Sequence, residues 1–175
     1  MPARVAAVAY AQAIISSGGR CAISSRAVSE IMCADYSLDH YEKIRRIAVR
    51  DTLRPVSVDA ADFEKLADLF RQADVAIDLL PRMFADVVCR AAVKTGKSVV
   101  NTNYIHEIAQ YGEQAKEAGM AIMGECGLDP GIDLVFYNRA LRSFDEMRVI
   151  NSYCGGFPEK AACNNPLNYK ISWTW

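Results

Sequence analysis

The chain has 175 residues, of which 51% are hydrophobic and 23% charged, and its formal net charge is −1. This composition is typical of a globular domain with a core and excludes the low hydrophobicity and high charge of a disordered chain. The sequence contains no basic stripe and no apolar run near the roughly 18 residues that span a bilayer. We therefore expect neither a nucleic-acid partner nor a membrane partner.

The first segment of the chain is apolar and rich in alanine. Residues 5–15 follow Arg4 and precede a cluster of small residues, an order that shares features with a secretory signal peptide. One arginine is a thin basic region, however, and Tyr10 and Gln12 interrupt the apolar run. These features favour an alanine-rich helix packed on a sheet.

From residue 30 onward, short apolar runs alternate with segments of helical periodicity. We predict strands at residues 30–36, 53–59, 74–81, 97–104 and 120–127. We predict helices at residues 37–48, 63–72, 82–96 and 105–119, with Ser37 as an N-cap and Gly96 and Gly119 as C-terminal caps. This alternation predicts an α/β fold, a Rossmann-like doubly wound parallel sheet with right-handed crossovers.

The pattern changes after Gly127. We predict a turn and a helix with Pro130 at its first position, then strands at residues 147–156 and 169–175 separated by a loop. We therefore place a truncated dinucleotide-binding domain at residues 1–126. Residues 127–175 are expected to begin a second, incomplete α+β domain for substrate binding and dimerisation.

Ligands of such sheets collect at the carboxyl ends of the strands. Asp35 ends the first strand of the alternating run, where an acidic side chain accepts hydrogen bonds from the adenosine ribose and repels a 2′-phosphate. This position favours NAD over NADP. The alternative is that Asp35 only caps the helix that follows.

The glycine fingerprint of dinucleotide-binding proteins is missing. Residues 1–20 contain only Gly18 and Gly19, so G-x-G-x-x-G does not precede Asp35. Because residues 5–15 are taken as the first helix, we predict that the sheet lacks its first strand and its glycine loop. The backbone N–H groups that hold a pyrophosphate would then be absent.

The segment GECGLDPGID, residues 124–133, is the most specific stretch of the chain. Gly127 and Gly131 permit a tight turn and the close approach of a ligand. A buried Asp129 there would bind an ammonium or imine nitrogen, or alternatively would serve only as a helix N-cap.

The stretch NTNYIHEIAQYGEQAKEAGMAIMGECGLDPGID, followed by SYCGG, NNPLNYK and SWTW, resembles the saccharopine dehydrogenase (glutamate-forming) family. The resemblance runs from about Glu30 to Trp175, and residues 1–29 depart from the family pattern. It implies an NAD(P)-dependent oxidoreductase of lysine metabolism. Such an enzyme oxidises a secondary amine to an imine, which water hydrolyses to glutamate and aminoadipate semialdehyde.

The resemblance also implies roles for particular residues. Catalytic roles fall on Asp129 and Tyr104, and substrate contacts on Asn103, Tyr104 and Asp129. The cofactor contacts are expected at Asp35, Asp59, Leu79, Leu80, Pro81, Leu128, Pro130 and Thr174. No zinc site is expected, because none of the six cysteines forms a C-x-x-C pair.

The sequence leaves the exact activity open. A related lysine 6-dehydrogenase or carboxynorspermidine synthase and a non-catalytic remnant are the alternatives to a saccharopine enzyme that is inactive as this fragment. The resemblance implies a small amino-acid substrate and a homodimer of the complete protein. Cys33, Cys126 and Cys154 lie in or beside apolar runs, which favours free thiols and a cytoplasmic location.

Overall fold

The computed structural model describes residues 3–9, 28–39, 41–48, 52–155, 160, 164–166 and 168. The chain divides into two compact units, Met1–Tyr137 and Asn138–Trp175.

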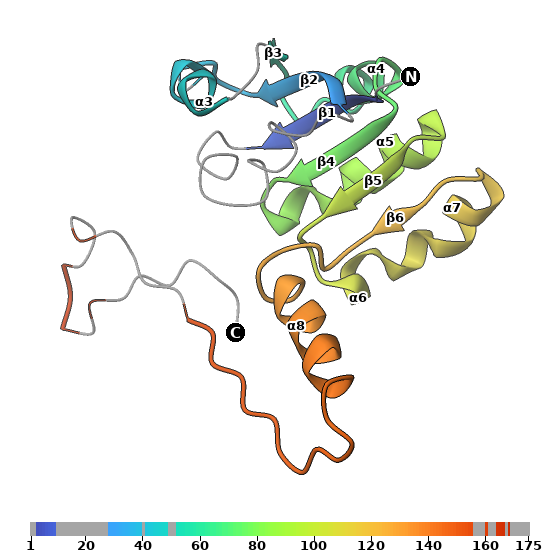
Figure 1. The fold of residues 1–175 in the computed structure, drawn as a ribbon. Helices are drawn as coiled ribbons and strands as arrows, with labels where there is room; N and C mark the ends of the chain where they lie inside the picture. The colour runs from blue at the N-terminus through green and yellow to red at the C-terminus, as the bar shows by residue number, and fades with distance from the viewer. Residues whose placement is uncertain are drawn as a thin grey trace. The chain divides into compact units, whose positions relative to one another are not determined.

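The described strands of the first unit form one parallel sheet in the order β3-β2-β1-β4-β5-β6 (Figure 1). The strands are β1 (Ala3–Ala9), β2 (Val28–Asp35), β3 (Leu53–Ser57), β4 (Val75–Leu79), β5 (Ser98–Asn101) and β6 (Ile122–Met123). The chain moves outward from β1 to β3, returns to β4 and then proceeds to β6. This order confirms the predicted Rossmann-like sheet.

Helical segments connect the strands. They are α3 (Tyr41–Ile47), α4 (Phe63–Arg71), η1 (Arg82–Phe84), α5 (Ala85–Thr95), α6 (Ile105–Ile108), η2 (Ala109–Tyr111), α7 (Gly112–Glu117) and α8 (Ile132–Leu141). Gly96 ends α5 in the left-handed region, with φ +64°, as predicted. The Ser37 cap was wrong: α3 begins at Tyr41, and the Ser37 hydroxyl accepts the Asp39 N–H in the preceding turn instead.

The prediction that the sheet lacks its first strand was wrong. Ala3–Ala9 forms β1, which pairs with β2 on one side and β4 on the other. Val5 and Ala7 are buried on one face of the sheet, whereas Ala6 and Val8 are buried on the other. A strand covered on both faces is apolar at every position, so hydrophobic periodicity cannot distinguish it from a helix.

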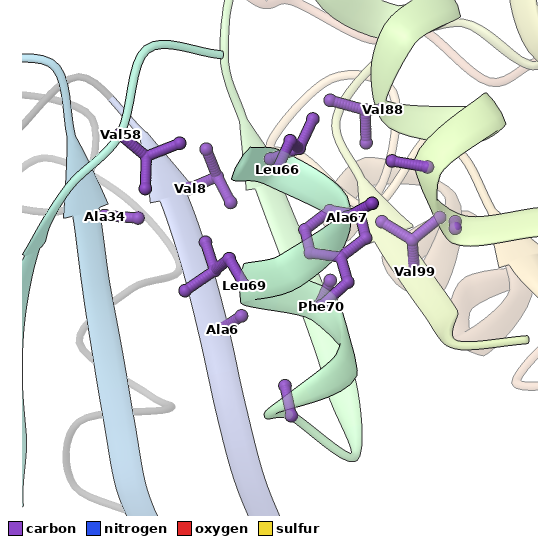
Figure 2. Packing of buried hydrophobic residues seen from close by; sticks show 14 of the residues in the cluster. Ala6, Val8, Ala34, Val58, Leu66, Ala67, Leu69, Phe70, Val88 and Val99 are labelled. Atoms are coloured by element: carbon purple, nitrogen blue, oxygen red, sulfur yellow. The ribbon is translucent and has the colours of Figure 1, made fainter. Parts of the chain in front are cut away.

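The larger core lies between the sheet and the helices α4 and α5. Leu66, Leu69 and Phe70 of α4 are at most 2% exposed and pack in one cluster with Val8 of β1 and Val88 of α5 (Figure 2). On the opposite face, Ile44 of α3 packs with apolar side chains of β1 and β2. These two layers cover both faces of the sheet, and the segments at its carboxyl edge start from strands that are packed on both sides.

The strand predicted at residues 147–156 is not formed within its described part. Residues 146–155 have no helix or strand, and no described strand pairs with them. A strand persists only where its backbone groups pair with a neighbour. The strand predicted at residues 169–175, which includes Thr174, lies outside the described residues.

Candidate functional site

The carboxyl ends of the parallel strands share one edge of the sheet, shown in Figure 1. Asp35, Leu79 and Asn101 end β2, β4 and β5, and the turn at residues 127–131 follows β6. Between β2 and β4 lies β1, where the strand order reverses direction. Such a switch point opens a crevice in which nucleotides bind.

Asp35 stands at the end of β2 beside a small pocket. The pocket is lined by Cys33, Ala34, Asp35, Ser37, Leu38, Tyr41 and Ile44. One Asp35 carboxylate oxygen accepts the Ser37 N–H at 3.4 Å, and the side chain is only partly buried. Asp35 thus lies at the strand end where a Rossmann-like sheet meets the adenosine ribose of its dinucleotide.

Asp59 follows β3 and is exposed. One of its carboxylate oxygens accepts the Ala61 N–H at 2.9 Å, whereas Asp62 caps α4 by accepting the Lys65 N–H. Asp59 thus shapes the turn that leads into α4, and its contact with a cofactor stays a prediction.

The end of β4 presents apolar groups. Leu79 and Leu80 are partly buried and Pro81 is exposed. The Leu80 N–H donates to an Asp78 carboxylate oxygen at 2.9 Å, which fixes the direction in which the chain leaves the strand. An apolar, partly open strand end suits the flat face of an aromatic ring.

Asn103 and Tyr104 follow β5 but differ in exposure. Asn103 is only 4% exposed, and its amide Nδ2 donates to Asp78 Oδ2 at 3.3 Å. Tyr104 is partly buried, and its ring stacks on His106 with centroids 5.6 Å apart. Tyr104 is therefore better placed than Asn103 to reach a substrate.

Asp78 and Asn101 belong to this edge and were missed at the sequence level. Both are at most 1% exposed, and Asn101 Oδ1 accepts the Asn103 N–H at 3.2 Å. Burial raises the pKa of the Asp78 carboxyl to about 7, against the lowering effect of the Leu80 N–H. The sequence signal that could have identified Asp78 is an aspartate at an inward-facing position of the otherwise apolar strand β4.

The segment GLDPG forms a closed turn after β6. The Gly127 N–H donates to the Pro130 carbonyl and the Ile132 N–H to the Gly127 carbonyl, both at 3.0 Å. A Cβ on Gly131 would lie 2.2 Å from the Gly127 carbonyl oxygen, and the φ of Gly131 is +149°. Only glycine fits at this position.

The expected roles of Asp129 and Pro130 at the helix start were wrong. The helix α8 begins at Ile132, so neither residue is its N-cap or first residue. Asp133 performs the capping instead, because its carboxylate accepts the Gly131 N–H at 2.6 Å. Asp129 is exposed at the tip of the turn rather than buried, and Leu128 beside it is also exposed. The Asp129 carboxylate is thus accessible to a ligand.

Thr174 lies outside the described residues, and so do residues 10–27, which include much of the helix predicted at residues 5–15. The sequence of residues 10–27 contains Gly18 and Gly19 but no G-x-G-x-x-G. Within the described part of the chain, no His, Cys, Asp and Glu side chains group as metal ligands. No helix there is long and apolar enough to cross a membrane.

Comparisons with known proteins identify two family models. Residues 20–123 match the saccharopine dehydrogenase NADP binding domain, and residues 127–175 match the saccharopine dehydrogenase C-terminal domain. An alpha-aminoadipic semialdehyde synthase of Arabidopsis thaliana is 37% identical over 83% of this chain and 14% of its own length. The saccharopine dehydrogenase [NADP(+), L-glutamate-forming] of Pyricularia oryzae is 35% identical over 69% of this chain and 28% of its own.

Among solved structures, the apo saccharopine dehydrogenase (L-Glu forming) from Saccharomyces cerevisiae superimposes with a TM-score of 0.73 at 26% identity. That match covers 98% of this chain and 38% of the yeast chain. The chain therefore spans well under half the length of the relatives that it matches.

Proposed function

Since the chain belongs to the saccharopine dehydrogenase family, we propose that it forms the dinucleotide-binding part of an oxidoreductase that acts on saccharopine. The observation that carries this proposal is the common position of Asp35, the β4 end, Tyr104 and the GLDPG turn on one edge of one parallel sheet. The reaction transfers a hydride from the carbon of a secondary amine C–N bond to the dinucleotide and releases the proton of the nitrogen, which leaves an imine. Water then releases glutamate and aminoadipate semialdehyde.

The described residues suit the two nucleoside ends of an NAD(P) molecule. The Asp35 carboxylate at the end of β2 would accept hydrogen bonds from the adenosine ribose, and the partly open Leu79–Pro81 segment suits the nicotinamide ring. When bound, the dinucleotide supplies the hydride acceptor. The fit to the pyrophosphate bridge between these ends is poorer, because the sequence lacks the glycine spacing that lets backbone N–H groups approach the phosphates.

The residues of this chain would then orient the substrate. The exposed Asp129 carboxylate would hold the positively charged amine, and the Tyr104 hydroxyl would orient a substrate carboxylate or the attacking water. The closed turn supports this role of Asp129, since its hydrogen bonds hold the backbone on both sides of the aspartate.

The proposed cofactor preference is NAD, although the matched family model is described as NADP-binding. Asp35 is partly exposed at the end of β2, where its charge would repel a 2′-phosphate. Asp35→Ser should therefore strengthen the binding of NADPH relative to that of NADH, so that the two affinities measured by calorimetric titration become more similar. Asp39→Ser, an exposed aspartate in the next turn, is the matched control and should leave the ratio unchanged. Equal affinities in the unmodified chain would contradict the assignment.

The second candidate is a non-catalytic remnant of the family, which the missing glycine spacing favours. Both candidates agree that this chain alone binds dinucleotide weakly and does not complete the reaction. They differ in where the dinucleotide binds. The first candidate requires NADH to contact residues of the carboxyl edge of the sheet, whereas the second candidate requires no such contact. The saccharopine assignment is preferred to a lysine 6-dehydrogenase or a carboxynorspermidine synthase because the relatives above are saccharopine enzymes.

We further propose a cytoplasmic location and, in the complete protein, a homodimer. The location is supported by the described cysteines Cys33, Cys89 and Cys126, which are free thiols. The homodimer rests on the resemblance to the family, and size-exclusion chromatography with light scattering tests it.

A further inference from the structure

A buried polar network lies beneath the candidate site, and the proposed chemistry does not use it. Asp78, Asn101 and Asn103 are 0%, 1% and 4% exposed, whereas the other buried residues of the described chain are apolar or aromatic. An ionisable group in such a position requires partners, because an isolated buried charge is strongly unfavourable. The partners of Asp78 show what this carboxyl does.

The two carboxylate oxygens of Asp78 hold two different strand ends. Oδ1 accepts the Leu80 N–H at 2.9 Å, at the point where β4 ends. Oδ2 accepts from Asn103 Nδ2 at 3.3 Å, two residues beyond the end of β5. One side chain therefore bridges the neighbouring strands that carry Leu80 and Tyr104.

Asn103 and Asn101 extend the connection to the segment after β6. The carbonyl of Asn103 accepts the Glu125 N–H at 2.9 Å, and the carbonyl of Asn101 accepts the Cys126 N–H at 3.0 Å. The Glu125 carboxylate in turn accepts the Ile105 N–H at 3.2 Å, at the start of α6. The segment that leads into the GLDPG turn is thus tied to Asn103, which Asp78 holds, and to Asn101, whose Oδ1 accepts the Asn103 N–H.

We propose that Asp78 is a positioning residue that fixes the ends of β4 and β5 and, through Asn103, the approach to the turn that carries Asp129. This role rests on the proposed function, because it places the nicotinamide-facing and amine-facing groups relative to one another. Asp78 is fully buried and would touch neither cofactor nor substrate. Its effect passes through Leu80 and Asn103.

A carboxylate suits this position better than an amide. Both of its oxygens are acceptors, so they match the two donors, the Leu80 N–H and Asn103 Nδ2. Asp78→Asn would place an NH2 group against one of these donors. The combination Asp78→Asn with Asn103→Asp exchanges donor and acceptor and restores the pair.

Protonation of Asp78 provides an observable signal of this coupling. Burial raises the pKa of the Asp78 carboxyl to about 7. As the pH falls through this value, the carboxylate that accepts the bonds from Leu80 and Asn103 gains a proton and becomes a hydroxyl donor. Among the described residues, the titratable group on α5 that senses the Asp78 charge is Cys89. Burial first, then Asp78 and Asp86, raise the pKa of this thiol to about 12, so it stays neutral.

The test is a pH titration of the 175-residue chain followed by the backbone amide signals in 15N NMR spectra. We expect the amides of Leu80, Asn103 and Glu125 to share one titration step with a midpoint near 7. Asp78→Asn should abolish the step at all three positions, and the reciprocal double variant should return the Leu80 and Glu125 signals toward their unmodified positions. Asp74→Asn, a carboxylate just before β4 that accepts the Arg4 N–H, is the control and should leave the step intact.

The outcomes separate this inference from the proposed function. Independent midpoints at Leu80 and Glu125, or a step that persists in Asp78→Asn, would overturn the positioning role. If Asp78→Asn does not fold, the titration midpoints of Leu80 and Glu125 in the unmodified chain are sufficient to test the positioning role. Addition of NADH should shift the Leu80 and Asn103 signals, with at least a threefold weaker affinity for Asp78→Asn. A shared titration step without any NADH-induced shift would support the positioning network and refute the proposed function.

Discussion

Replacement of Gly131 by alanine should open the GLDPG turn without unfolding the sheet. The new Cβ would lie 2.2 Å from the Gly127 carbonyl oxygen and 2.6 Å from its nitrogen. Both are backbone atoms of the same turn, so they cannot move away unless the turn opens. The φ of +149° adds strain, because L residues rarely adopt it.

The expected cost can be estimated from the bonds that would be lost. The turn contains two backbone hydrogen bonds between Gly127 and its partners Pro130 and Ile132, and a third bond joins Gly131 to Asp133. At about 1 kcal/mol for each of the three bonds, with about 1–3 kcal/mol of backbone strain, the turn loses about 4–6 kcal/mol. Amide hydrogen exchange at Ile132 and Asp133 should accelerate by at least about 100-fold.

The effect should remain local, because α8 contributes no buried residue. The urea unfolding midpoint of the sheet should therefore change little. Two glycines provide matched controls. Gly119→Ala has a φ of +66° but open space and should cost about 1 kcal/mol, whereas Gly112→Ala has open space and no positive φ, so it should be neutral or stabilising. Unchanged exchange at Ile132 in Gly131→Ala would refute the steric argument.

Three further predictions concern the core and the buried titratable groups. The Asp78 carboxyl has a pKa of about 7 in the folded chain against 3.8 for an unperturbed aspartate, so its contribution to stability is complete below pH 3.8 and is lost as the pH rises through about 7. At 1.36 kcal/mol per pH unit this loss amounts to about 4 kcal/mol. In urea melts from pH 4 to 8, the free energy of unfolding of Asp78→Asn should therefore depend less on pH than that of the unmodified chain. Identical profiles would contradict the shift. Phe70→Ala should cost about 3–5 kcal/mol because the ring is fully buried, whereas Phe136→Ala, at a ring that is 63% exposed, should cost less than about 1 kcal/mol in the same melts. Iodoacetamide should modify the exposed Cys126 before the buried Cys89, whose pKa is raised to about 12; mass spectrometry of the folded chain checks the order, and early modification of Cys89 would show that α5 opens.

The alternation of strands and helices was predictable because each element carries its own signal. The helix α4 places Leu66 and Phe70 on one face, and Gly96 ends α5 in the conformation that glycine favours. The strand β1 was not predictable in this way. It is buried on both faces and rich in alanine, the residue with the highest helix propensity, so local preference pointed to the wrong element.

The candidate site was predictable in position but not in its contacts. Asp35 and Tyr104 could be placed because the ends of parallel strands meet at one edge. The bond from Asn103 to Asp78 joins residues far apart in sequence, and the capping role of Asp133 depends on where α8 begins. Sequence periodicity contains neither kind of information, because both depend on tertiary geometry.

The central claim is that the carboxyl edge of this sheet binds a dinucleotide, with NAD preferred. The most direct test is a titration of the 175-residue chain with NADH and NADPH, followed by backbone amide shifts. NADH should shift the signals of Asp35, Leu80 and Asn103 and those of residues 127–131, with a dissociation constant weaker than about 10 µM because the glycine spacing is missing. NADPH should bind more weakly than NADH. The absence of shifts at these residues, or tighter binding of NADPH, would contradict the account.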